Sequence, residues 1–383
     1  MLFNKIILLT KVKLVKDDNL KYSIPSIINS NVNFEIWNLY NIFHTKNKYI
    51  TDNINTDLNI INIDIYEQFL LKLKKCNEKT LLIDNFLCTN LADANLIVRK
   101  RNIKILCSLL SPTPFSLKNL NTFNKILKLF KEPKFYFKKF LKKKGNKLLL
   151  DYYVNINNNI SYNSEYLISK NTKVIQTHSY DYQKYINFEN TPNSTIIDTD
   201  YTVFLDEGIT CHPDYEYLGV KQYCKTSIYF EELRNFFDYF ENKTNTKIII
   251  AGHPKVKYSP PYKNFFRRQI IENKTLNLVK FSKYTLSHMS TSINFSIIYN
   301  KPIFFLDSFN YGFLLRNHIN TIAKFLLVKP ILISNNNYDI NLHMTNIKNY
   351  QQYMHSFITS TVSVSKHNWV DIISKIDSKM LKV

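Results

Sequence analysis

The sequence predicts an α/β fold with two domains, each built on a mainly parallel β-sheet. Strand-like runs alternate with helix-like runs along both halves of the chain, which is the order that parallel strands joined by crossover helices produce. The length of 383 residues accommodates two domains of roughly 150 residues each. Hydrophobic residues make up 45% of the chain and aromatic residues 14%, which provides for sizeable cores and excludes global disorder.

The first half carries strand-like and helix-like runs in alternation. The expected strands cover residues 6–9, 32–37, 80–83 and 103–109, and the expected helices cover residues 66–75 and 91–101. Two stretches rich in Asn and Asp, residues 47–57 and 155–163, are candidate linkers. The order favours an α/β domain with a mainly parallel sheet.

The second half alternates more regularly. Strands are expected at residues 172–177, 202–205, 247–251, 284–287, 302–306 and near 325–333, and helices at 275–282, 293–299 and near 313–324. This rhythm is typical of a doubly wound domain. Helices at residues 347–359 and 366–380 would close it.

One further helix is indicated by an apolar face with helical spacing. The residues of this face are Tyr229, Leu233, Phe236, Phe237 and Phe240. Ser227 is a possible N-cap of this helix, and Glu231 and Glu232 suit its first turn.

The charge of the chain favours an anionic partner. Lys and Arg number 51 against 30 Asp and Glu, a formal net charge of +21, and such a field raises the local concentration of anions. Nucleic acid, an anionic membrane face, phosphorylated donors and acidic glycans all fit. The abundance of Lys and Asn and the presence of only five glycines indicate the coding bias of an AT-rich genome, so part of the charge reflects mutational drift. A remaining glycine then indicates a position that needs positive φ or close backbone approach.

Residues 122–144 form a basic amphipathic segment. Phe123, Ile126, Leu127 and Phe130 follow helical spacing with lysines between them, and Lys142–Lys144 end the segment. This surface suits the anionic headgroups on the cytoplasmic face of an inner membrane, or it is a solvated helix whose apolar face packs on its own domain. No run approaches the roughly 18 uncharged apolar residues of a membrane span, so any membrane contact is expected to be peripheral.

The cysteines and the start of the chain favour a cytoplasmic location. The five cysteines include no Cys-x-x-Cys pair, and no His cluster stands at ligand spacing, so neither a disulfide framework nor a metal site is indicated. The apolar run after Met1 is shorter than the hydrophobic region of a signal peptide and is interrupted by Lys11 and Lys13.

The first motif with chemical content is Asp206-Glu207-Gly208, directly after an expected strand. Ligands of open α/β sheets bind outside the carboxyl ends of the strands, and two adjacent carboxylates suppress each other's ionisation, which suits a general base. The alternative is an acidic turn in which Gly208 supplies a positive φ.

The second motif is Gly252-His253-Pro254, again after a strand. A His in this place can face a phosphate as donor or general acid, and Pro254 fixes the direction of the loop. The alternative is a structural His at a strand end. A second His-Pro pair, His212-Pro213, shows that the dipeptide alone is a weak signal.

The third motif is the hydroxyl run Ser290-Thr291-Ser292 before an expected helix. Free backbone amides, the helix dipole and the hydroxyls would bind an anion there, although Ser and Thr are also common helix caps.

The three motifs would lie at one edge of one sheet. A base, a phosphate-facing His and a phosphate site suit transfer of a group from a nucleotide-activated donor to a hydroxyl. No GxxxxGK(S/T) or GxGxxG motif occurs, which disfavours P-loop kinase and nicotinamide chemistry. Asp198 and Asp200 stand before a strand and are interpreted as a turn rather than a metal site.

These motifs, in this order, resemble the signature of bacterial sialyltransferases of the two-domain GT-B type. Residues 204–306 also resemble glycosyltransferase-like proteins of lipopolysaccharide and capsule biosynthesis. The resemblance implies a GT-B-like α/β fold with two Rossmann-like domains facing an interdomain cleft. Residues 1–195 would form the acceptor-side domain and residues 196–383 the domain that binds the nucleotide sugar.

The resemblance also implies an activity. An inverting, metal-independent glycosyltransferase would move a CMP-activated acidic sugar (sialic acid, a related nonulosonate or Kdo) to a hydroxyl of lipooligosaccharide, lipopolysaccharide or capsule, with no cofactor. Asp206 is the first choice for the base and Glu207 the second, while His253 would stabilise the departing phosphate.

Ser290, Thr291 and Ser292 would hold that phosphate, and the family has a pair where this chain has three hydroxyls.

Two alternatives to this function remain. One is a GT-B enzyme that uses a UDP- or GDP-sugar. The other is a non-enzymatic binder of anionic polymer, although no nucleic-acid module is recognised and nucleic acid is not an expected partner.

Overall fold

The computed structural model describes residues 1–11, 23–44, 58–86, 88–114, 149–156, 168–213, 215, 221–258, 262–335, 337–338, 340–342, 345–359 and 367–382. The basic segment 122–144, the candidate linker 47–57 and most of the candidate linker 155–163 lie outside these ranges. The described residues separate into two compact units. Unit 1 takes those within Met1–Leu110, Ser116–Thr177 and Val362–Val383, and unit 2 takes those within Ser111–Phe115 and His178–Thr361.

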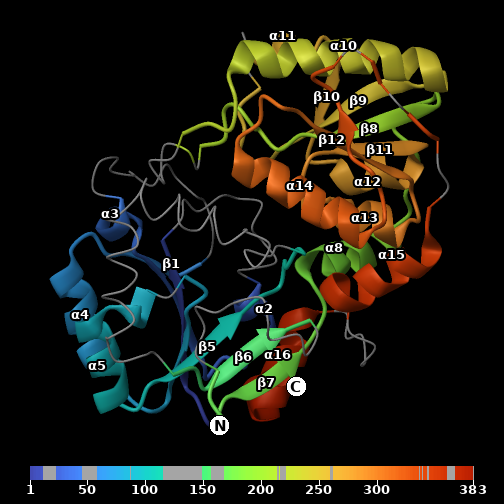
Figure 1. The fold of residues 1–383 in the computed structure, drawn as a ribbon. Helices are drawn as coiled ribbons and strands as arrows, with labels where there is room; N and C mark the ends of the chain where they lie inside the picture. Colours follow the sequence, from blue (N-terminus) through green and yellow to red (C-terminus); the bar gives the residue numbers. More distant parts are fainter. Residues whose placement is uncertain are drawn as a thin grey trace. The chain divides into compact units, whose positions relative to one another are not determined.

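In the described part of unit 1, seven parallel strands form one sheet in the order β3-β2-β1-β4-β5-β6-β7 (Figure 1). The strands are β1 (Lys5–Thr10), β2 (Asn33–Asn38), β3 (Ile60–Asn62), β4 (Thr80–Ile83), β5 (Lys104–Ser108), β6 (Tyr152–Asn155) and β7 (Lys173–Gln176). The helices are α2 (Ile24–Ile27), α3 (Tyr40–Phe43), α4 (Tyr66–Lys74), η1 (Cys88–Asn90), α5 (Ala92–Lys100), α16 (Asn368–Asp377) and η5 (Ser378–Met380). Buried residues of β1, β4 and β5 pack against Phe69 of α4 and Val98 of α5.

In the described part of unit 2, six parallel strands follow the order β10-β9-β8-β11-β12-β13. The strands are β8 (Tyr201–Leu205), β9 (Lys247–Gly252), β10 (Gln269–Glu272), β11 (Tyr284–Ser287), β12 (Ile303–Asp307) and β13 (Ile331–Leu332). The helices are α8 (Tyr180–Glu189), α10 (Thr226–Thr244), α11 (Tyr262–Phe265), α12 (Thr275–Phe281), α13 (Ile293–Ile298), α14 (Phe313–Phe325), α15 (Ile347–Tyr353) and η4 (Met354–Ile358). In Figure 1, α10 lies on one side of these strands and α12 and α13 lie on the other.

Both sheets have the strand order of a Rossmann fold. Numbered from its own first strand, each begins 3-2-1-4-5-6, and unit 1 adds a seventh strand. The expected pair of Rossmann-like domains is therefore confirmed. In such a sheet the chain reverses direction between strands 1 and 4, which in unit 2 are β8 and β11, and ligands bind outside the carboxyl ends at this switch point.

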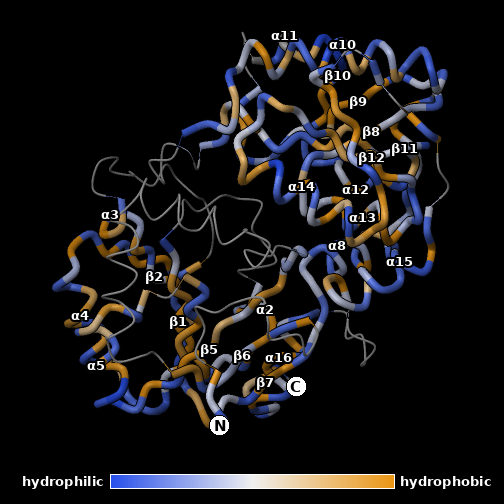
Figure 2. Tube along the Cα trace, in the orientation of Figure 1, coloured by the Kyte–Doolittle hydropathy of each residue, from blue (hydrophilic) through white to orange (hydrophobic). Residues whose placement is uncertain are grey.

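The core of unit 2 is rich in aromatic rings. The apolar face expected on α10 is buried throughout, with all five of its side chains at most 1% exposed. Phe237 of α10 packs edge-on against Phe204 of β8, with ring centroids 5.2 Å apart. Figure 2 shows the hydrophobic colour along the central strands, as expected for strands buried on both faces.

Three local predictions were wrong. The helix with the aromatic face begins at Thr226 with Lys225 as its N-cap, so Ser227 lies inside the helix and does not cap it. For the same reason Glu231 and Glu232 lie in the second turn, and the first turn has no acidic residue. The strand expected near residues 325–333 is only Ile331–Leu332, because α14 continues to Phe325. Phe325 is the last residue of α14, and residues 326–330 connect it to β13, a boundary that apolar periodicity alone does not locate.

The units divide earlier than the expected boundary after residue 195. Helix α8 belongs to unit 2, where it packs on α13 and where Ser179 donates its amide to the Ile358 carbonyl at 2.7 Å. The C-terminal helices are also divided between the two units. α15 and η4 belong to unit 2, whereas α16 returns to unit 1, where the Lys375 ammonium donates to the Gln176 carbonyl at 2.7 Å. Within the described residues, no helix combines the length and apolarity that crossing a membrane requires.

Candidate active site

The three motifs meet in one cavity of unit 2. The cavity, of about 460 Å³, opens at the carboxyl ends of the adjacent strands β9, β8 and β11. Its lining includes the motif residues Asp206, Glu207, Gly252, His253, Pro254, Ser290, Thr291 and Ser292. A cavity of about 670 Å³ between α14, β13 and α15 contains none of them. The expectation that the motifs line one crevice is confirmed, and the crevice lies at the switch point of the sheet.

Glu207 spans this switch point. Its Oε1 accepts the backbone amides of His288 at 3.1 Å and Met289 at 2.8 Å, and the Ser287 hydroxyl at 3.3 Å, so the end of β8 is tied to the loop after β11. Among the described residues, every hydrogen bond to this carboxylate ends on Oε1. Burial raises the pKa of Glu207 to about 7, although these three donors act in the opposite direction. A carboxyl group held by one oxygen, with such a pKa, suits a general base at neutral pH.

Asp206 is engaged through both carboxylate oxygens. Its Oδ1 accepts the Gly208 amide at 3.1 Å, and its Oδ2 accepts a short hydrogen bond from the Tyr258 hydroxyl. Burial raises the pKa of Asp206, and the two hydrogen bonds oppose that rise. The side chain is 3% exposed. Asp206 is therefore more constrained than Glu207.

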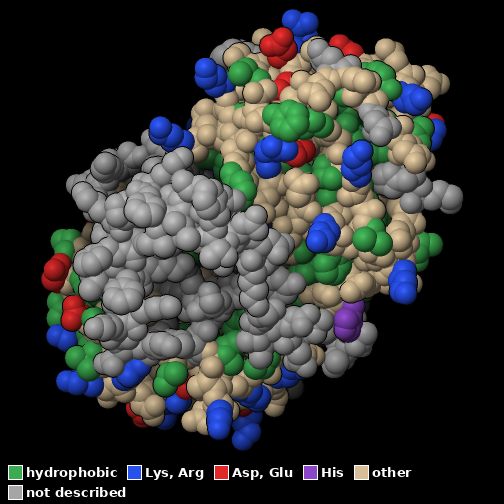
Figure 3. Space-filling model, in the orientation of Figure 1, with side chains coloured by type: hydrophobic (Ala, Val, Ile, Leu, Met, Phe, Trp, Pro, Cys, Tyr) green, Lys and Arg blue, Asp and Glu red, His purple; other side chains and the backbone are tan. Residues whose placement is uncertain are grey.

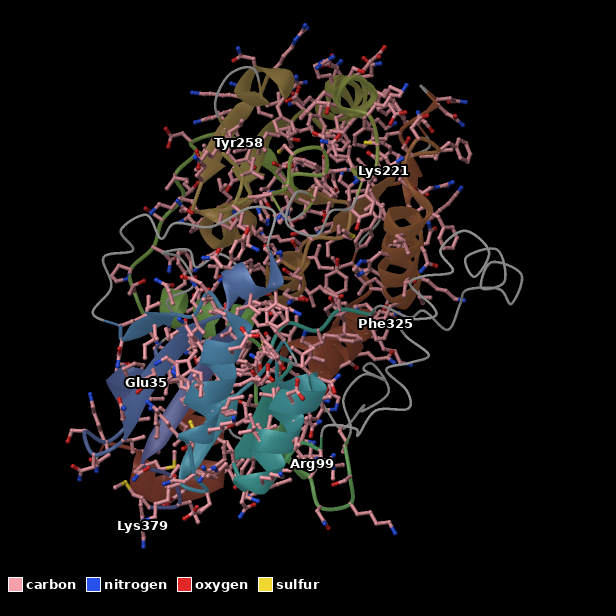
Figure 4. All side chains as sticks on the ribbon, turned by 90° about the vertical axis from the view of Figure 1, so that its left-hand side faces the viewer. Glu35, Arg99, Lys221, Tyr258, Phe325 and Lys379 are labelled. Carbon is pink, nitrogen blue, oxygen red and sulfur yellow. The ribbon has the colours of Figure 1, made fainter. Side chains whose placement is uncertain are left out.

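Tyr258 connects the acid motif to the His-Pro motif. Its hydroxyl donates to Asp206 and accepts the His253 amide at 2.6 Å. Burial and the neighbouring Asp206 charge raise the pKa of Tyr258, so its hydroxyl stays protonated and remains a donor. Tyr258 is labelled on the ribbon of unit 2 in Figure 4. The sequence does not predict the role of this residue, because no local pattern marks a tyrosine five positions after a His as a partner of an acid 52 positions before it.

Two glycines allow this network to form. Gly208 has φ +60°, and a Cβ there would lie 2.6 Å from Val256 Cγ2. A Cβ on Gly252 would lie 2.9 Å from Tyr258 Cε2, so the absent side chain leaves room for the Tyr258 ring. The expectation that a remaining glycine indicates positive φ or close approach is confirmed at both positions.

His253 lies at the end of β9 with its ring at the cavity. Its Nδ1 accepts the Lys255 amide at 3.2 Å, which in the neutral ring places the proton on Nε2. The ring of His212 stands edge-on to it, with centroids 4.8 Å apart, and His212 also lines the cavity. The two His-Pro pairs that sequence analysis treated as competing therefore converge on one site.

The hydroxyl run lies on the opposite side of β8 from His253. The Ser290 hydroxyl accepts the Ser292 amide at 3.2 Å, and the Ser290 amide donates to Ser287 Oγ at 3.2 Å. Helix α13 begins at Ile293 and has six residues, so an anion here would be held mainly by the hydroxyls rather than by the dipole of a long helix.

Helix α8 adds two residues that sequence analysis did not assign to the site. Asp181 and Lys184 line the cavity, and Asp181 Oδ2 accepts the Asn294 side-chain amide at 2.8 Å. The residues of α8 that are buried, Asp181 and Gln183, are both polar, so the hydrophobic period that reveals a helix is weak there.

Comparisons with known proteins find likeness in structure only. No family model matches the sequence, and no curated protein matches it. The glycosyltransferase of kitacinnamycin aligns over 97% of this chain and 99% of its own, with 8% identity and a TM-score of 0.50. S. aureus MnaA, solved with UDP, aligns over 98% of both chains with 13% identity and a TM-score of 0.45. The wall teichoic acid polymerase TagF aligns over 98% of this chain and 89% of its own, with 10% identity and a TM-score of 0.42.

The fold is GT-B-like. This follows from the two Rossmann-ordered parallel sheets, together with the likeness to the kitacinnamycin enzyme. The cavity lined by the three motifs lies in unit 2 of this fold, at the carboxyl edge of its sheet.

Proposed function

We propose that this chain is an inverting glycosyltransferase that moves a sugar from a nucleotide-activated donor to a hydroxyl. The observation that carries the proposal is the meeting of Glu207, His253 and the hydroxyls of Ser290–Ser292 in one cavity at the switch point of unit 2. The kitacinnamycin protein is a glycosyltransferase, which supports the same class of reaction.

In the proposed reaction Glu207 is the base. Its carboxylate takes the proton of the acceptor hydroxyl, whose oxygen attacks the anomeric carbon from the side opposite the phosphate. The bond between that carbon and the phosphate oxygen breaks, and the electron pair stays on the phosphate. Asp206, the first choice from the sequence, is the less suitable base because both of its oxygens already accept hydrogen bonds.

The other motif residues would stabilise the leaving group. His253 donates from Nε2 to the phosphate as negative charge develops there, and the hydroxyls of Ser290, Thr291 and Ser292 hold the same group. We propose that the reaction needs neither a metal nor another cofactor. Gly208, Gly252 and Pro254 support the geometry of the loops.

The donor we propose is a CMP-linked acidic sugar (sialic acid, a related nonulosonate or Kdo), on the strength of the motif resemblance. The acceptor would be a hydroxyl of a bacterial surface glycan. Residues 122–144 would bring the enzyme to the cytoplasmic face of the inner membrane. A UDP- or GDP-sugar is the alternative donor, since the residues of the cavity suit any nucleotide phosphate.

A donor panel tests the proposal. The protein is incubated with CMP-, UDP- and GDP-sugars and a glycan acceptor, and the free nucleotide is measured. We expect release of CMP that depends on acceptor and falls about 10²- to 10⁴-fold in Glu207→Gln, because the general base is lost. For His253→Ala we expect a lower kcat. Release of UDP or GDP alone would favour the alternative donor, and no transfer with any donor would contradict the enzymatic proposal.

A further inference from the structure

The imidazole of His212 lies in the same cavity as that of His253, and the proposed reaction has not used it. The two rings meet edge to face at 67°, with centroids 4.8 Å apart. Both residues precede a proline, and both line the cavity with Glu207.

The acid motif holds His212 in place. The His212 amide donates to the Gly208 carbonyl at 2.7 Å, and the Cys211 amide donates to the same carbonyl at 2.9 Å. These bonds close the turn that Gly208 opens with its positive φ. The His212 carbonyl then accepts the Tyr215 amide at 3.1 Å. His212 is therefore fixed on the loop that carries Glu207, while His253 is fixed on the loop of the next strand.

The charged groups that line the cavity with the two rings come from two elements. Asp206 and Glu207 follow β8, and Asp181 and Lys184 come from α8. Tyr258 binds the backbone of His253 and the carboxylate of Asp206, so its hydroxyl is occupied by that network. Both imidazoles line the same cavity with their ring centroids 4.8 Å apart, and imidazole N–H groups are donors that suit the several acceptor oxygens of one phosphate group.

We propose that His212 is a second catalytic residue, whose imidazole N–H donates to the donor phosphate beside His253. The inference rests on the proposed function and names an additional residue for it. When the bond between the anomeric carbon and the phosphate oxygen breaks, the electron pair stays on the phosphate and the acceptor proton goes to Glu207. Both imidazoles keep their protons and stabilise the charge of the leaving phosphate through hydrogen bonds.

The test compares nucleotide binding with nucleoside binding by calorimetry. CMP and cytidine are titrated into the wild-type protein, His212→Ala, His253→Ala and the double variant, and the UDP/uridine and GDP/guanosine pairs are run in parallel. We expect His212→Ala to weaken nucleotide binding about tenfold or more, the loss of a hydrogen bond to a charged group, and to change nucleoside binding less than twofold. In the double variant the two losses should not add, because both residues contact one phosphate.

Several outcomes separate this inference from the proposed function. Unchanged nucleotide binding in His212→Ala, or equal weakening of nucleoside binding, would overturn the role of His212 while transfer by the wild-type protein upholds the function. Phosphate-dependent binding through His212 without any transfer would uphold the contact between His212 and the phosphate, but it would contradict the function and with it a catalytic role of His212. A wild-type protein that binds no nucleotide would overturn both.

Two further variants serve as controls. His355→Ala removes an exposed imidazole of η4, outside the cavity, and should leave both affinities unchanged. His212→Asn keeps a side-chain N–H donor and should recover part of the nucleotide affinity. Retained nucleoside binding shows that each variant is folded.

Discussion

At the scale of single residues, we expect Glu207 to set how the proposed transferase activity responds to pH. Its pKa of about 7 predicts that kcat/KM rises with pH through a midpoint near 7, because the base must be deprotonated. The rise of kcat/KM around pH 7 should disappear in Glu207→Gln together with the activity. An Asp206→Asn variant should keep this rise. If Asp206→Asn loses the rise and Glu207→Gln retains activity, Asp206 is the base, as the sequence first indicated.

The same carboxyl group is expected to lower the stability of the folded chain as the pH rises, whereas it raises the proposed activity. The folded pKa of Glu207 lies above its ordinary value of 4.5, so between about pH 4.5 and 7 the unfolded chain releases a proton that the folded chain retains. Its contribution to stability is therefore present at low pH and lost as the pH rises. We expect Glu207→Gln to be more stable than wild type at pH 8, by up to about 3 kcal/mol, and equal to it near pH 4. Urea unfolding at the two pH values measures this, and equal stability at pH 8 would contradict it.

Tyr258 should matter more at high pH than at low pH. Tyr258→Phe removes the donor to Asp206 and the acceptor for the His253 amide, so the pKa of Asp206 should rise further. We expect a loss of about 1–3 kcal/mol at pH 8 and a smaller loss at pH 3, where Asp206, with an ordinary value of 3.8, is mostly protonated in the unfolded chain as well. Urea unfolding is the measurement. Tyr239→Phe, at a partly exposed ring on α10, is the matched control.

At the scale of elements, the aromatic face of α10 should dominate the stability of unit 2. Phe237 is fully buried and packs on Phe204 of β8, the strand that carries Asp206 and Glu207. Phe237→Ala should cost about 3–5 kcal/mol in the free energy of unfolding because it leaves a cavity. Asn235→Ala, on the exposed face of the same helix, should change it by less than about 0.5 kcal/mol. Similar losses in both variants would contradict this account of the core.

Elements with a strong apolar period could be predicted, and those without one could not. β4 was identified from a continuous apolar run, β11 from alternating residues, and α10 from apolar residues at the period of a helix. β3, β6 and β10 are short strands with partly polar sequences, and the two residues that α8 buries are polar. Missing α8 had a consequence for the site, because Asp181 and Lys184 are supplied by it.

The part of the site whose residues directly follow strand ends could be predicted from the sequence. Parallel strands bring their carboxyl ends to one edge, so Glu207, His253 and Ser290 could be placed together from their positions in the sequence. Tyr258 and the pairing of His212 with His253 depend on loop conformations, which no local pattern specifies.

At the scale of the whole molecule, the net charge of +21 does not by itself say which surface attracts anions. Figure 3 shows the Lys and Arg side chains of unit 2 as separate patches on the face in view. Spread charges attract anions weakly at any one point, because salt screens exposed charges beyond about 10 Å. A dense basic segment behaves differently, and residues 122–144, which lie outside the described residues, are the densest such segment noted in the sequence.

We therefore predict that this segment, and not the total charge, directs the protein to anionic membranes. A variant with Lys142→Glu, Lys143→Glu and Lys144→Glu should bind vesicles rich in anionic lipid roughly a hundredfold more weakly, at about 1 kcal/mol per lysine near the surface. A control with Lys243→Glu, Lys247→Glu and Lys274→Glu, at exposed positions of unit 2, changes the net charge equally and should bind nearly as wild type. Sedimentation with vesicles at low and high salt measures both. Equal losses in the two variants would assign the attraction to the charge of the whole molecule, and binding by neither wild type nor variant would leave residues 122–144 to pack on their own domain.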